Sequence, residues 1–258
     1  METKLANVSK ELLLPLWARA KETMYGNSIV KDNKAVEIIK QIDYDFSKFD
    51  NFWMAQIDVA VMTKILDDRA EKFIKKYPNS TIINIGCGLD TRFNRIDNGR
   101  VIWYDMDVPE SIALRKSFFK ENDRYKMIPK SLSDKSWIHD IKEKNNKILI
   151  ISDGVSLKIP KEENSTFELI RENFCECEIL VKLSSPFIIK ELESLKVLNK
   201  SADINNNEEV IETYMKYCEV IEQLSFSDFY KDKSEKILDR IPCIKNNCKD
   251  RILHLKIK

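Results

Sequence analysis

Two glycines one residue apart stand where a short apolar run meets the start of a helical pattern. Residues 81–92 read TIINIGCGLDTR, so Gly86, Cys87 and Gly88 follow the apolar residues directly. Glycines at such a strand end let the backbone turn sharply and approach a ligand closely, because neither carries a Cβ atom. The chain contains only five glycines, which makes the pair more informative. The segment predicts a nucleotide-cofactor loop.

The residues that follow the glycines distinguish between cofactors. A dinucleotide-binding fingerprint has a third glycine at position 91, where it leaves room for a pyrophosphate. This chain has Asp90 and Thr91 there. A carboxylate at that place repels a pyrophosphate but suits a cofactor that carries an amino group or a sulfonium. The loop therefore favours S-adenosylmethionine over NAD, whereas a Gly-x-Gly pair alone also occurs in ordinary strand-to-helix turns.

The second predicted strand ends in WYDMDVPE and offers two carboxylates to the same edge of the sheet. Asp105 and Asp107 lie roughly 20 residues beyond the glycines, where a carboxylate can accept hydrogen bonds from both ribose hydroxyls. The alternative is that an aspartate ahead of Pro109 only caps the next helix. Both residues are cofactor-binding candidates, and the pair can divide the two roles.

The third and fourth strands also end in polar residues. Ser131 and Leu132 follow the third strand, where a hydroxyl and neighbouring backbone amides can bind the edge of adenine, although a plain turn has the same appearance. Asp153 follows the fourth strand, ILIIS, and either faces the cleft or forms an ordinary Asp-Gly turn. Arg92, directly after the glycine motif, is expected to pair with a carboxylate at a strand end.

Helical and strand patterns alternate along most of the chain. After helices at 9–25, 33–42 and 54–76, the pattern predicts strands at 82–86, 101–105, 126–129, 147–152, 178–183, 218–224 and 251–257, with helices at 89–97, 108–121, 136–143 and 161–173. Such alternation gives an α/β fold with a doubly wound, Rossmann-like sheet of seven strands, the last of them antiparallel. Residues 1–78 form an N-terminal helical cap on a core of residues 79–258, in one structural domain.

Composition excludes several classes of function. Lys and Arg total 43 against 42 for Asp and Glu, so the net charge of +1 provides no field for nucleic acid or an anionic membrane. No run of about 18 apolar residues predicts a membrane span, and the N-terminal LLLPLWA is no signal peptide. Six cysteines and two histidines show no metal-ligand spacing. We expect a cytoplasmic protein with reduced thiols, no metal and a small-molecule partner, and leave the oligomeric state open.

Five segments in order carry a resemblance to a known family. LLLPLWARAKET, DNKAVEIIKQIDYDF, INIGCGLDTRF, VIWYDMDVPE and SLSDKSW resemble the leucine carboxyl methyltransferase family, in particular its bacterial branch, over about residues 10–185. The resemblance implies a class I methyltransferase fold and S-adenosylmethionine as cofactor. It also implies esterification of a carboxylate on a peptide C-terminus or a small metabolite. By the same resemblance, Gly86 belongs to the cofactor loop, Asp107 binds the ribose, and Ser131 with Leu132 lies beside the adenine.

The chain departs from the family pattern at two places. The family has an arginine for the methionine carboxylate in a block like VAVRTKILD, whereas this chain reads VAVMTKILD, with Met62. Lys64, Arg19 and Lys21 are the candidates to replace it. The fourth-strand motif of the family resembles EGxxxY, but here Asp153 replaces the glutamate and Lys158 replaces the aromatic residue. These departures bear on activity more than on fold.

The expected reaction asks little acid–base chemistry of the protein. A sulfonium methyl group is electrophilic, and a carboxylate with a pKa of about 4 is ionised at pH 7, so no general base is needed. A cation near the acceptor oxygen would position the substrate, and Arg19 from the cap or Lys158 is the predicted catalytic residue. The alternative is that both are ordinary surface cations.

Three functions follow from the sequence. The leading one is an S-adenosylmethionine-dependent O-methyltransferase that acts on a carboxylate of a small metabolite. The second is a catalytically decayed methyltransferase fold with a binding or regulatory role, which Met62, Asp153 and Lys158 suggest. The third, a nicotinamide-dependent oxidoreductase, is disfavoured by Asp90 and Thr91.

Overall fold

A computed structural model describes residues 9–144, 146–153, 166–184, 193, 207–231 and 250–258. Within these ranges, seven strands form one sheet in the order β3-β2-β1-β4-β5-β7-β6. They are β1 (Thr81–Ile85), β2 (Ile102–Asp107), β3 (Tyr125–Pro129), β4 (Ile148–Ser152), β5 (Cys177–Leu183), β6 (Cys218–Ser225) and β7 (Arg251–Ile257). The first five strands are parallel, and β7 pairs antiparallel with both β5 and β6. The predicted fold and its antiparallel last strands are confirmed.

The two central strands explain why the sheet forms where it does. Every residue of β1 and of β4 is buried, and both segments are rich in isoleucine. A strand that is apolar on both faces must be covered on both faces, which is typical of a parallel sheet between two layers of helices. Neighbouring residues serve opposite layers: Ile82 belongs to one hydrophobic cluster and Ile83 to the other.

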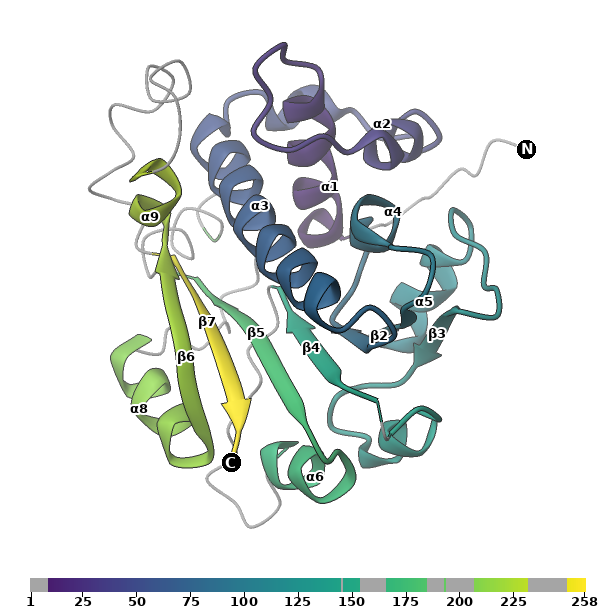
Figure 1. The fold of residues 1–258 in the computed structure, drawn as a ribbon. Helices are drawn as coiled ribbons and strands as arrows, with labels where there is room; N and C mark the ends of the chain where they lie inside the picture. The colour runs from purple at the N-terminus through teal and green to yellow at the C-terminus, as the bar shows by residue number, and fades with distance from the viewer. Residues whose placement is uncertain (1–8, 145, 154–165, 185–192, 194–206, 232–249) are drawn as a thin grey trace.

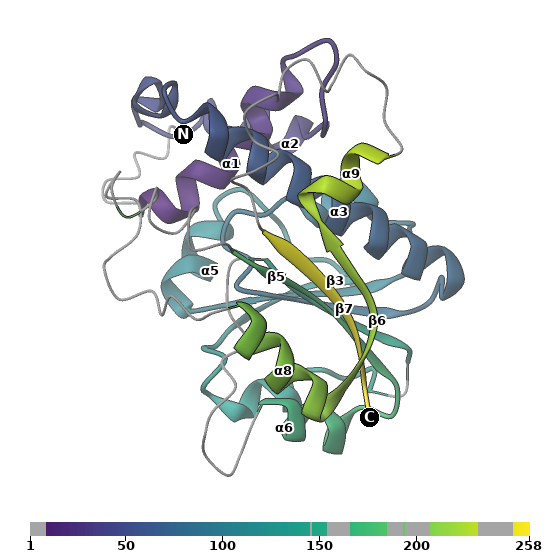
Figure 2. The ribbon, with the colours of Figure 1, turned by 90° about the vertical axis from the view of Figure 1, so that its left-hand side faces the viewer.

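The helices form those two layers. They are α1 (Lys10–Thr23), α2 (Asn33–Ile39), α3 (Trp53–Lys76), α4 (Arg92–Ile96), α5 (Pro109–Arg115), α6 (Thr166–Asn173), α8 (Asn207–Tyr217) and α9 (Phe226–Lys231), with short 3₁₀ turns η1 (Phe46–Phe49) and η2 (Lys135–His139). In Figure 1, α3 runs across one face of the sheet with α1 and α2 beyond it. Figure 2, turned by 90°, shows α6 and α8 on the opposite face.

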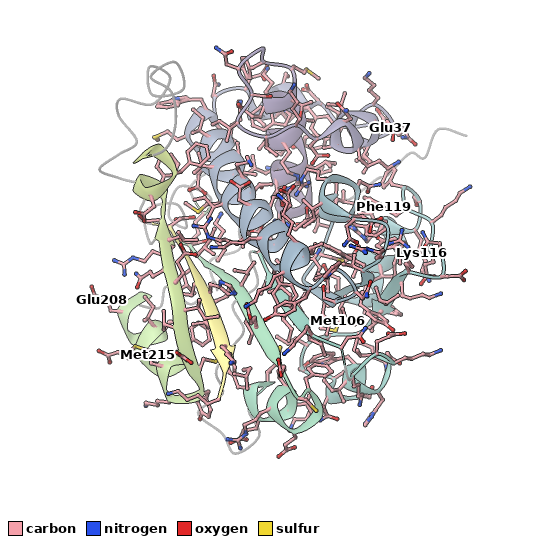
Figure 3. The ribbon with its side chains drawn as sticks, viewed as in Figure 1. Glu37, Met106, Lys116, Phe119, Glu208 and Met215 are labelled. Atoms are coloured by element: carbon pink, nitrogen blue, oxygen red, sulfur yellow. The ribbon has the colours of Figure 1, made fainter. Side chains whose placement is uncertain are left out.

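Side-chain placement follows the same layers. Figure 3 shows the charged side chains of Glu37, Lys116 and Glu208 on the outside of the molecule, whereas Met106 lies within it and is 1% exposed. The cap formed by α1, α2 and η1 contributes its leucines and aromatic rings to the same hydrophobic cluster as α3 and one face of the sheet. The boundary predicted at residue 78 therefore separates two sequence regions that share one core.

Several predicted helices are shorter in the structure, among them those at 33–42, 89–97, 108–121 and 136–143. The helix predicted at 108–121 ends at Arg115, because Phe118 and Phe119 turn back and bury their rings in the core. The helix predicted at 136–143 is the 3₁₀ turn η2, in which the Asp134 carboxylate accepts a hydrogen bond from the Ser136 amide. Residues 161–165 of the next predicted helix lie outside the described residues. None of the helices that the structure describes combines the length and apolar character of a membrane span.

Candidate functional site

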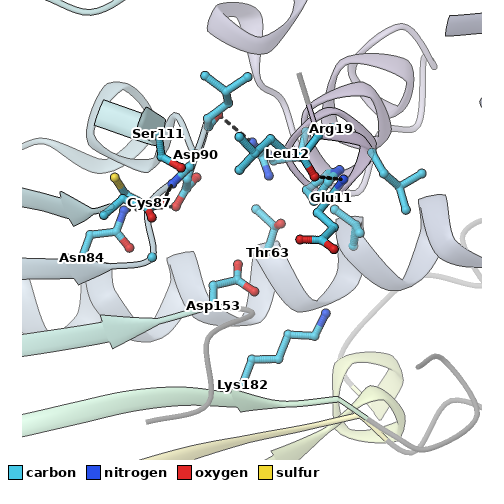
Figure 4. Close-up of a pocket in the computed structure, with 18 of the residues that line it drawn as sticks. Glu11, Leu12, Arg19, Thr63, Asn84, Cys87, Asp90, Ser111, Asp153 and Lys182 are labelled. Carbon is cyan, nitrogen blue, oxygen red and sulfur yellow. Dashed lines mark hydrogen bonds between the residues drawn. The ribbon is translucent and has the colours of Figure 1, made fainter. Parts of the chain in front are cut away.

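A cavity of about 460 Å³ opens at the carboxyl ends of the parallel strands, between the sheet and the two long helices α1 and α3 (Figure 4). Its size lies within the roughly 300 to 1,000 Å³ of small-molecule sites. The glycine loop, the residues after β2 and β4, and the end of β5 form its wall on the sheet side. This is the place where doubly wound sheets bind ligands, since the loops diverge there.

The glycine loop makes the turn that the sequence predicts. Gly86 and Gly88 have φ angles of 65° and 43°, in the left-handed region that favours glycine. The backbone amides of Gly86 and Cys87 donate to the Met106 carbonyl at 2.8 and 3.2 Å, which fixes the loop against β2. A Cβ atom at Gly88 would lie 2.7 Å from Cδ2 of Leu12 on α1. The cap therefore packs directly on the cofactor loop.

Cys87 lines the cavity between the two glycines, but its thiol is no nucleophile. The side chain is buried, and burial raises the pKa of the thiol well above its usual value. A thiol that stays protonated at neutral pH is unreactive. Cys87 contributes its backbone and its small volume.

Asp107 is the carboxylate of β2 that reaches the cavity. Its Oδ2 accepts a hydrogen bond from the Gly88 amide at 2.7 Å, and its Oδ1 accepts one from the Val108 amide at the same distance. Each carboxylate oxygen has two lone-pair positions, so both keep capacity for a ligand hydroxyl. Asp107 thus joins the end of β2 to the glycine loop and lines the cavity.

Asp105, the second predicted carboxylate of β2, lies elsewhere. It is fully buried and is not among the residues that line the cavity. Its Oδ1 accepts hydrogen bonds from Asn84 at 3.0 Å and Trp103 at 2.9 Å, and its Oδ2 accepts from Arg115 and Tyr125, both at 2.5 Å. These four bonds fill its acceptor capacity. The structure gives Asp105 a supporting place, in which the Arg115 that it holds also donates to the Gly88 carbonyl at 2.9 Å.

Two further predicted residues meet at Arg92, whose guanidinium is fully buried. It donates to Asp90 at 2.7 Å, to Asp67 at 2.7 Å and to Asp153 at 3.0 Å. The predicted pairing of Arg92 with a strand-end carboxylate is confirmed. Burial opposes ionisation of Asp90, but the Arg92 and Arg95 guanidiniums outweigh burial and hold its pKa well below the usual range. Asp90 and Asp153 therefore present fixed carboxylates to the cavity that they both line.

Arg19 also lines the cavity, although its guanidinium is already engaged. Its Nε donates to Asp32 at 2.9 Å and its Nη2 donates to the Leu89 carbonyl at 3.1 Å. Asp32 in turn accepts from Arg95 at 2.8 Å and from the Thr91 hydroxyl. Burial alone would raise the pKa of Asp32. The Arg95 and Arg19 guanidiniums outweigh burial, so the pKa lies below its usual value. This cluster fastens α1 to the residues that follow the glycines.

An unpredicted group of charges lies at the other end of the cavity. Lys182, on β5, places its Nζ 3.2 Å from Oδ2 of Asp58 on α3 and 3.4 Å from Oδ2 of Asp250, beside β7. Both Lys182 and Asp58 line the cavity, and Lys182 is held there although its side chain is only 9% exposed. A lysine in the penultimate position of CEILVKL, after the apolar run ILV, is the signal that sequence reasoning could have used.

Residues 13–167, more than half of the chain, match the family model described as leucine carboxyl methyltransferase. The chain belongs to this family. The similar curated proteins include the tetracenomycin polyketide synthesis O-methyltransferase TcmP of Streptomyces glaucescens, 32% identical over 154 residues. They also include the S-adenosyl-L-methionine-dependent methyltransferase dpfgK of Gibberella zeae, 26% identical over 176 residues.

These matches cover 59% and 62% of the chain, and only 57% and 58% of the two relatives. The chain thus spans less than three fifths of the length of these relatives. Among solved structures, a protein from Thermobifida fusca that is proposed to be a methyltransferase superposes with a TM-score of 0.57 at 10% identity, over 93% of this chain and 94% of that one. This likeness supports the fold, and family membership supports S-adenosylmethionine as the cofactor.

This member of the leucine carboxyl methyltransferase family has a methionine inside its core at the position of the expected arginine. Met62 is 1% exposed and belongs to the cluster under the cap. Two of the suggested replacements are engaged elsewhere: Lys64 pairs with Asp68 one turn along α3, and Lys21 pairs with Asp50 at 3.0 Å. Among the described residues that line the cavity, only Arg19 and Lys182 are basic.

Besides Asp105, two predicted site residues of this family member, Ser131 and Leu132, are not brought to the cavity. The Ser131 hydroxyl lies 2.9 Å from that of Ser133 in an exposed turn. Leu132 packs against the second hydrophobic cluster, and neither Ser131 nor Leu132 lines the cavity. Lys158 lies outside the described residues, so its predicted role remains a prediction.

Asp58 is expected to make the stability of the protein depend on pH. Burial and the nearby Asp250 carboxylate raise the pKa of Asp58 to about 8, although Lys182 lowers it. Between about pH 4 and about pH 8 the folded state then holds a proton that the unfolded state has released. The free energy of unfolding should therefore fall as pH rises through that window, by up to about 1.4 kcal/mol per pH unit.

The Asp58→Asn variant isolates this effect because asparagine does not titrate. At pH 4 it should match the wild type most closely, and its advantage in stability should grow from there to pH 8 in urea denaturation. Parallel stability curves for the two proteins between pH 5 and pH 8 would contradict the prediction.

Proposed function

We propose that this protein is an S-adenosylmethionine-dependent O-methyltransferase that methylates a carboxylate of a small metabolite. One observation carries the proposal: the Asp107 carboxylate accepts a hydrogen bond from the left-handed glycine loop, and both line the same cavity. Family membership supports the same reaction class.

The lining of the cavity fits the charge of this cofactor. Of the described residues that line it, five are acidic and two are basic. Asp58 holds a proton at neutral pH, which leaves the carboxylates of Glu11, Asp90, Asp107 and Asp153. An excess of carboxylates attracts a ligand that bears a sulfonium and an ammonium group. The left-handed Gly88 lines the cavity with backbone, and a Cβ atom there would meet the side chain of Leu12.

Each part of the cavity then has a role. Asp107 would hold the ribose hydroxyls, and the backbone of Gly86, Cys87 and Gly88 would lie along the cofactor. The fixed carboxylate of Asp153 would bind the amino group. When bound, the cofactor supplies an electrophilic methyl group.

The acceptor end needs to exclude water and to align an oxygen. Pro15, Ala55 and Val59 give it an apolar wall from α1 and α3. Because an acceptor carboxylate is ionised at neutral pH, the protein needs no base to activate it. Holding the two reacting groups in line can contribute about 7 to 11 kcal/mol in well-aligned systems.

The proposal is tested by calorimetry with S-adenosylmethionine and S-adenosylhomocysteine, followed by methyl-transfer assays. We expect dissociation constants on the order of micromolar, about −8 kcal/mol, and mass-spectrometric detection of methyl esters from a panel of carboxylic acids. The matched primary amides of the same acids are the controls. Methylation of the amides in preference to the acids, or binding of neither cofactor form, would contradict the proposal.

The core position of Met62 supports a second candidate, a protein that binds the cofactor without turnover. In that case S-adenosylhomocysteine should bind while no acid in the panel is methylated. If S-adenosylhomocysteine binds to Met62→Arg but not to the wild type, the natural protein has lost cofactor binding together with turnover.

Asp107→Ala is expected to weaken S-adenosylhomocysteine binding by about 10- to 100-fold. The substitution removes a charged acceptor for the ribose and the partner of the Gly88 amide, and hydrogen bonds to charged groups contribute about 1.5 to 3 kcal/mol. Calorimetry of the variant measures the loss. Asp123→Ala, which removes an exposed aspartate beyond α5, is the control and should bind like the wild type. Equal affinity of Asp107→Ala and the control would exclude the ribose role.

A further inference from the structure

The cavity has a second end, away from the glycine loop. Asp153 follows β4 and Lys182 lies near the end of β5, and the register of these parallel strands makes the two residues neighbours. In Figure 4 the side chain of Lys182 extends from β5 on the side of Asp153 that is away from Cys87. The α3 residues Asp58, Val59 and Thr63 line the cavity as well. The Lys182 end therefore combines one buried cation with the apolar Val59 and the polar side chains of Asp58 and Thr63.

Lys182 has donor capacity to spare. An ammonium group has three N–H donors. In the part of the chain that the structure describes, Nζ makes one hydrogen bond, to Asp58, and one longer ion-pair contact, to Asp250. A buried lysine is costly to retain in an apolar strand unless its charge is compensated, and Asp250 supplies a compensating charge. One N–H group thus remains for a ligand.

Asp58 is incompletely satisfied in the same place. Its Oδ2 accepts from Lys182, but its Oδ1 is buried without a hydrogen-bond partner among the described residues. A side chain that served stability alone would be expected to have partners for both oxygens, because buried polar atoms nearly always have partners. The unpaired oxygen belongs to a side chain that lines the cavity. The neighbouring Asp250 carboxylate can share the proton of Asp58, so a ligand at this place would take over that contact.

We propose that Lys182 and Asp58 form a binding site for a carboxylate group at this end of the cavity. The ammonium donates to one carboxylate oxygen, and the protonated Oδ1 of Asp58 donates to the other. The raised pKa of Asp58, about 8, keeps that proton in place at neutral pH. Asp250 lies 3.4 Å from the ammonium of Lys182, so this cation has a counter-charge before the ligand binds.

The inference rests on the proposed function, which brings two carboxylates into the cavity. One is the amino-acid carboxylate of the cofactor, and the other is that of the acceptor. Both would be recognised by the same pair of donors, and two titrations distinguish them.

The first titration compares S-adenosylhomocysteine with 5′-methylthioadenosine, which lacks the amino-acid carboxylate. If the site binds the cofactor, Lys182→Met should weaken S-adenosylhomocysteine by about 10- to 100-fold and leave 5′-methylthioadenosine unchanged. Lys182→Arg keeps the charge and should lose less. Lys147→Met is the matched control, because Lys147 pairs with Glu176 at the opposite end of the sheet.

The second titration uses benzoate and octanoate against benzamide and octanamide, with and without S-adenosylhomocysteine. If the site binds the acceptor, the wild type should bind each acid more tightly than the matched amide. In Lys182→Met the affinity for the acids should fall by about 10- to 100-fold, and the affinity for the amides should stay the same. The double variant Lys182→Met/Asp250→Asn removes both charges and so leaves no buried carboxylate of Asp250 without its lysine. If it melts like the wild type and still binds the acids weakly, the weaker binding does not come from misfolding. Lys182→Met affinities that equal the wild type in both titrations would overturn the carboxylate site. A wild type that binds neither nucleoside would count against the proposed function, while the acid titrations still test the site.

Discussion

Asp105→Ala should lower the free energy of unfolding by about 3 to 5 kcal/mol, measured by urea denaturation. The substitution leaves the Arg115 guanidinium buried without its carboxylate, and removing one partner of a buried ion pair has costs of this size. It also removes the acceptor of Tyr125, Trp103 and Asn84. The glycine loop should loosen with it, because Arg115 donates to the Gly88 carbonyl.

The exposed Asp123 provides the control for this effect, since Asp123→Ala should change stability by no more than about 0.5 kcal/mol. Asp105→Asn keeps the shape of the side chain and removes its charge, so it should fall between the two. A loss below about 1 kcal/mol in Asp105→Ala would show that Arg115 does not depend on this carboxylate.

Asp32→Ala should destabilise the protein by a similar amount, about 3 to 5 kcal/mol, and should do so by releasing the cap. Arg19 and Arg95 both lose a buried carboxylate, and the Ala35 amide loses the acceptor that caps α2. Hydrogen exchange should therefore rise first in α1 and α2, before the strands of the sheet exchange.

Asp50→Ala is the comparison in the same cap, because its pair with Lys21 is exposed. Exposed pairs contribute about 0 to 1 kcal/mol, so this variant should remain close to the wild type. Uniform exchange across cap and sheet in Asp32→Ala would mean that the cap does not open separately.

Local pattern was enough to predict the strands, their alternation with helices and the glycine loop. It could not separate Asp105 from Asp107, because residues two apart in a strand point to the same face. The difference is depth: Asp107 ends β2, whereas Asp105 lies two residues, about 7 Å, further into the sheet. Depth depends on where a strand ends, and strand ends are the least certain part of a sequence pattern.

The charges at the second end of the cavity depend on contacts that no local pattern contains. Lys182 and Asp58 are separated by 124 residues along the chain, and Arg19 reaches the Leu89 carbonyl across 70. The sequence predicts Arg19 as a cation near the acceptor oxygen, but it cannot show that the Asp32 carboxylate binds this guanidinium in the folded protein. For Met62 the sequence indicates which position departs from the family pattern. Only the packing in the structure shows that this side chain lies in the core.

The strand order has a consequence for the order of synthesis and folding. β6 is made before β7, yet it joins the sheet only through β7, which lies between β5 and β6. Until residues 251–257 have been made, β5 has an open edge where β7 will pair. We therefore expect the parallel part of the sheet to form first. Pairing of β7 with the β5 edge is then a late step, which also brings Asp250 to Lys182.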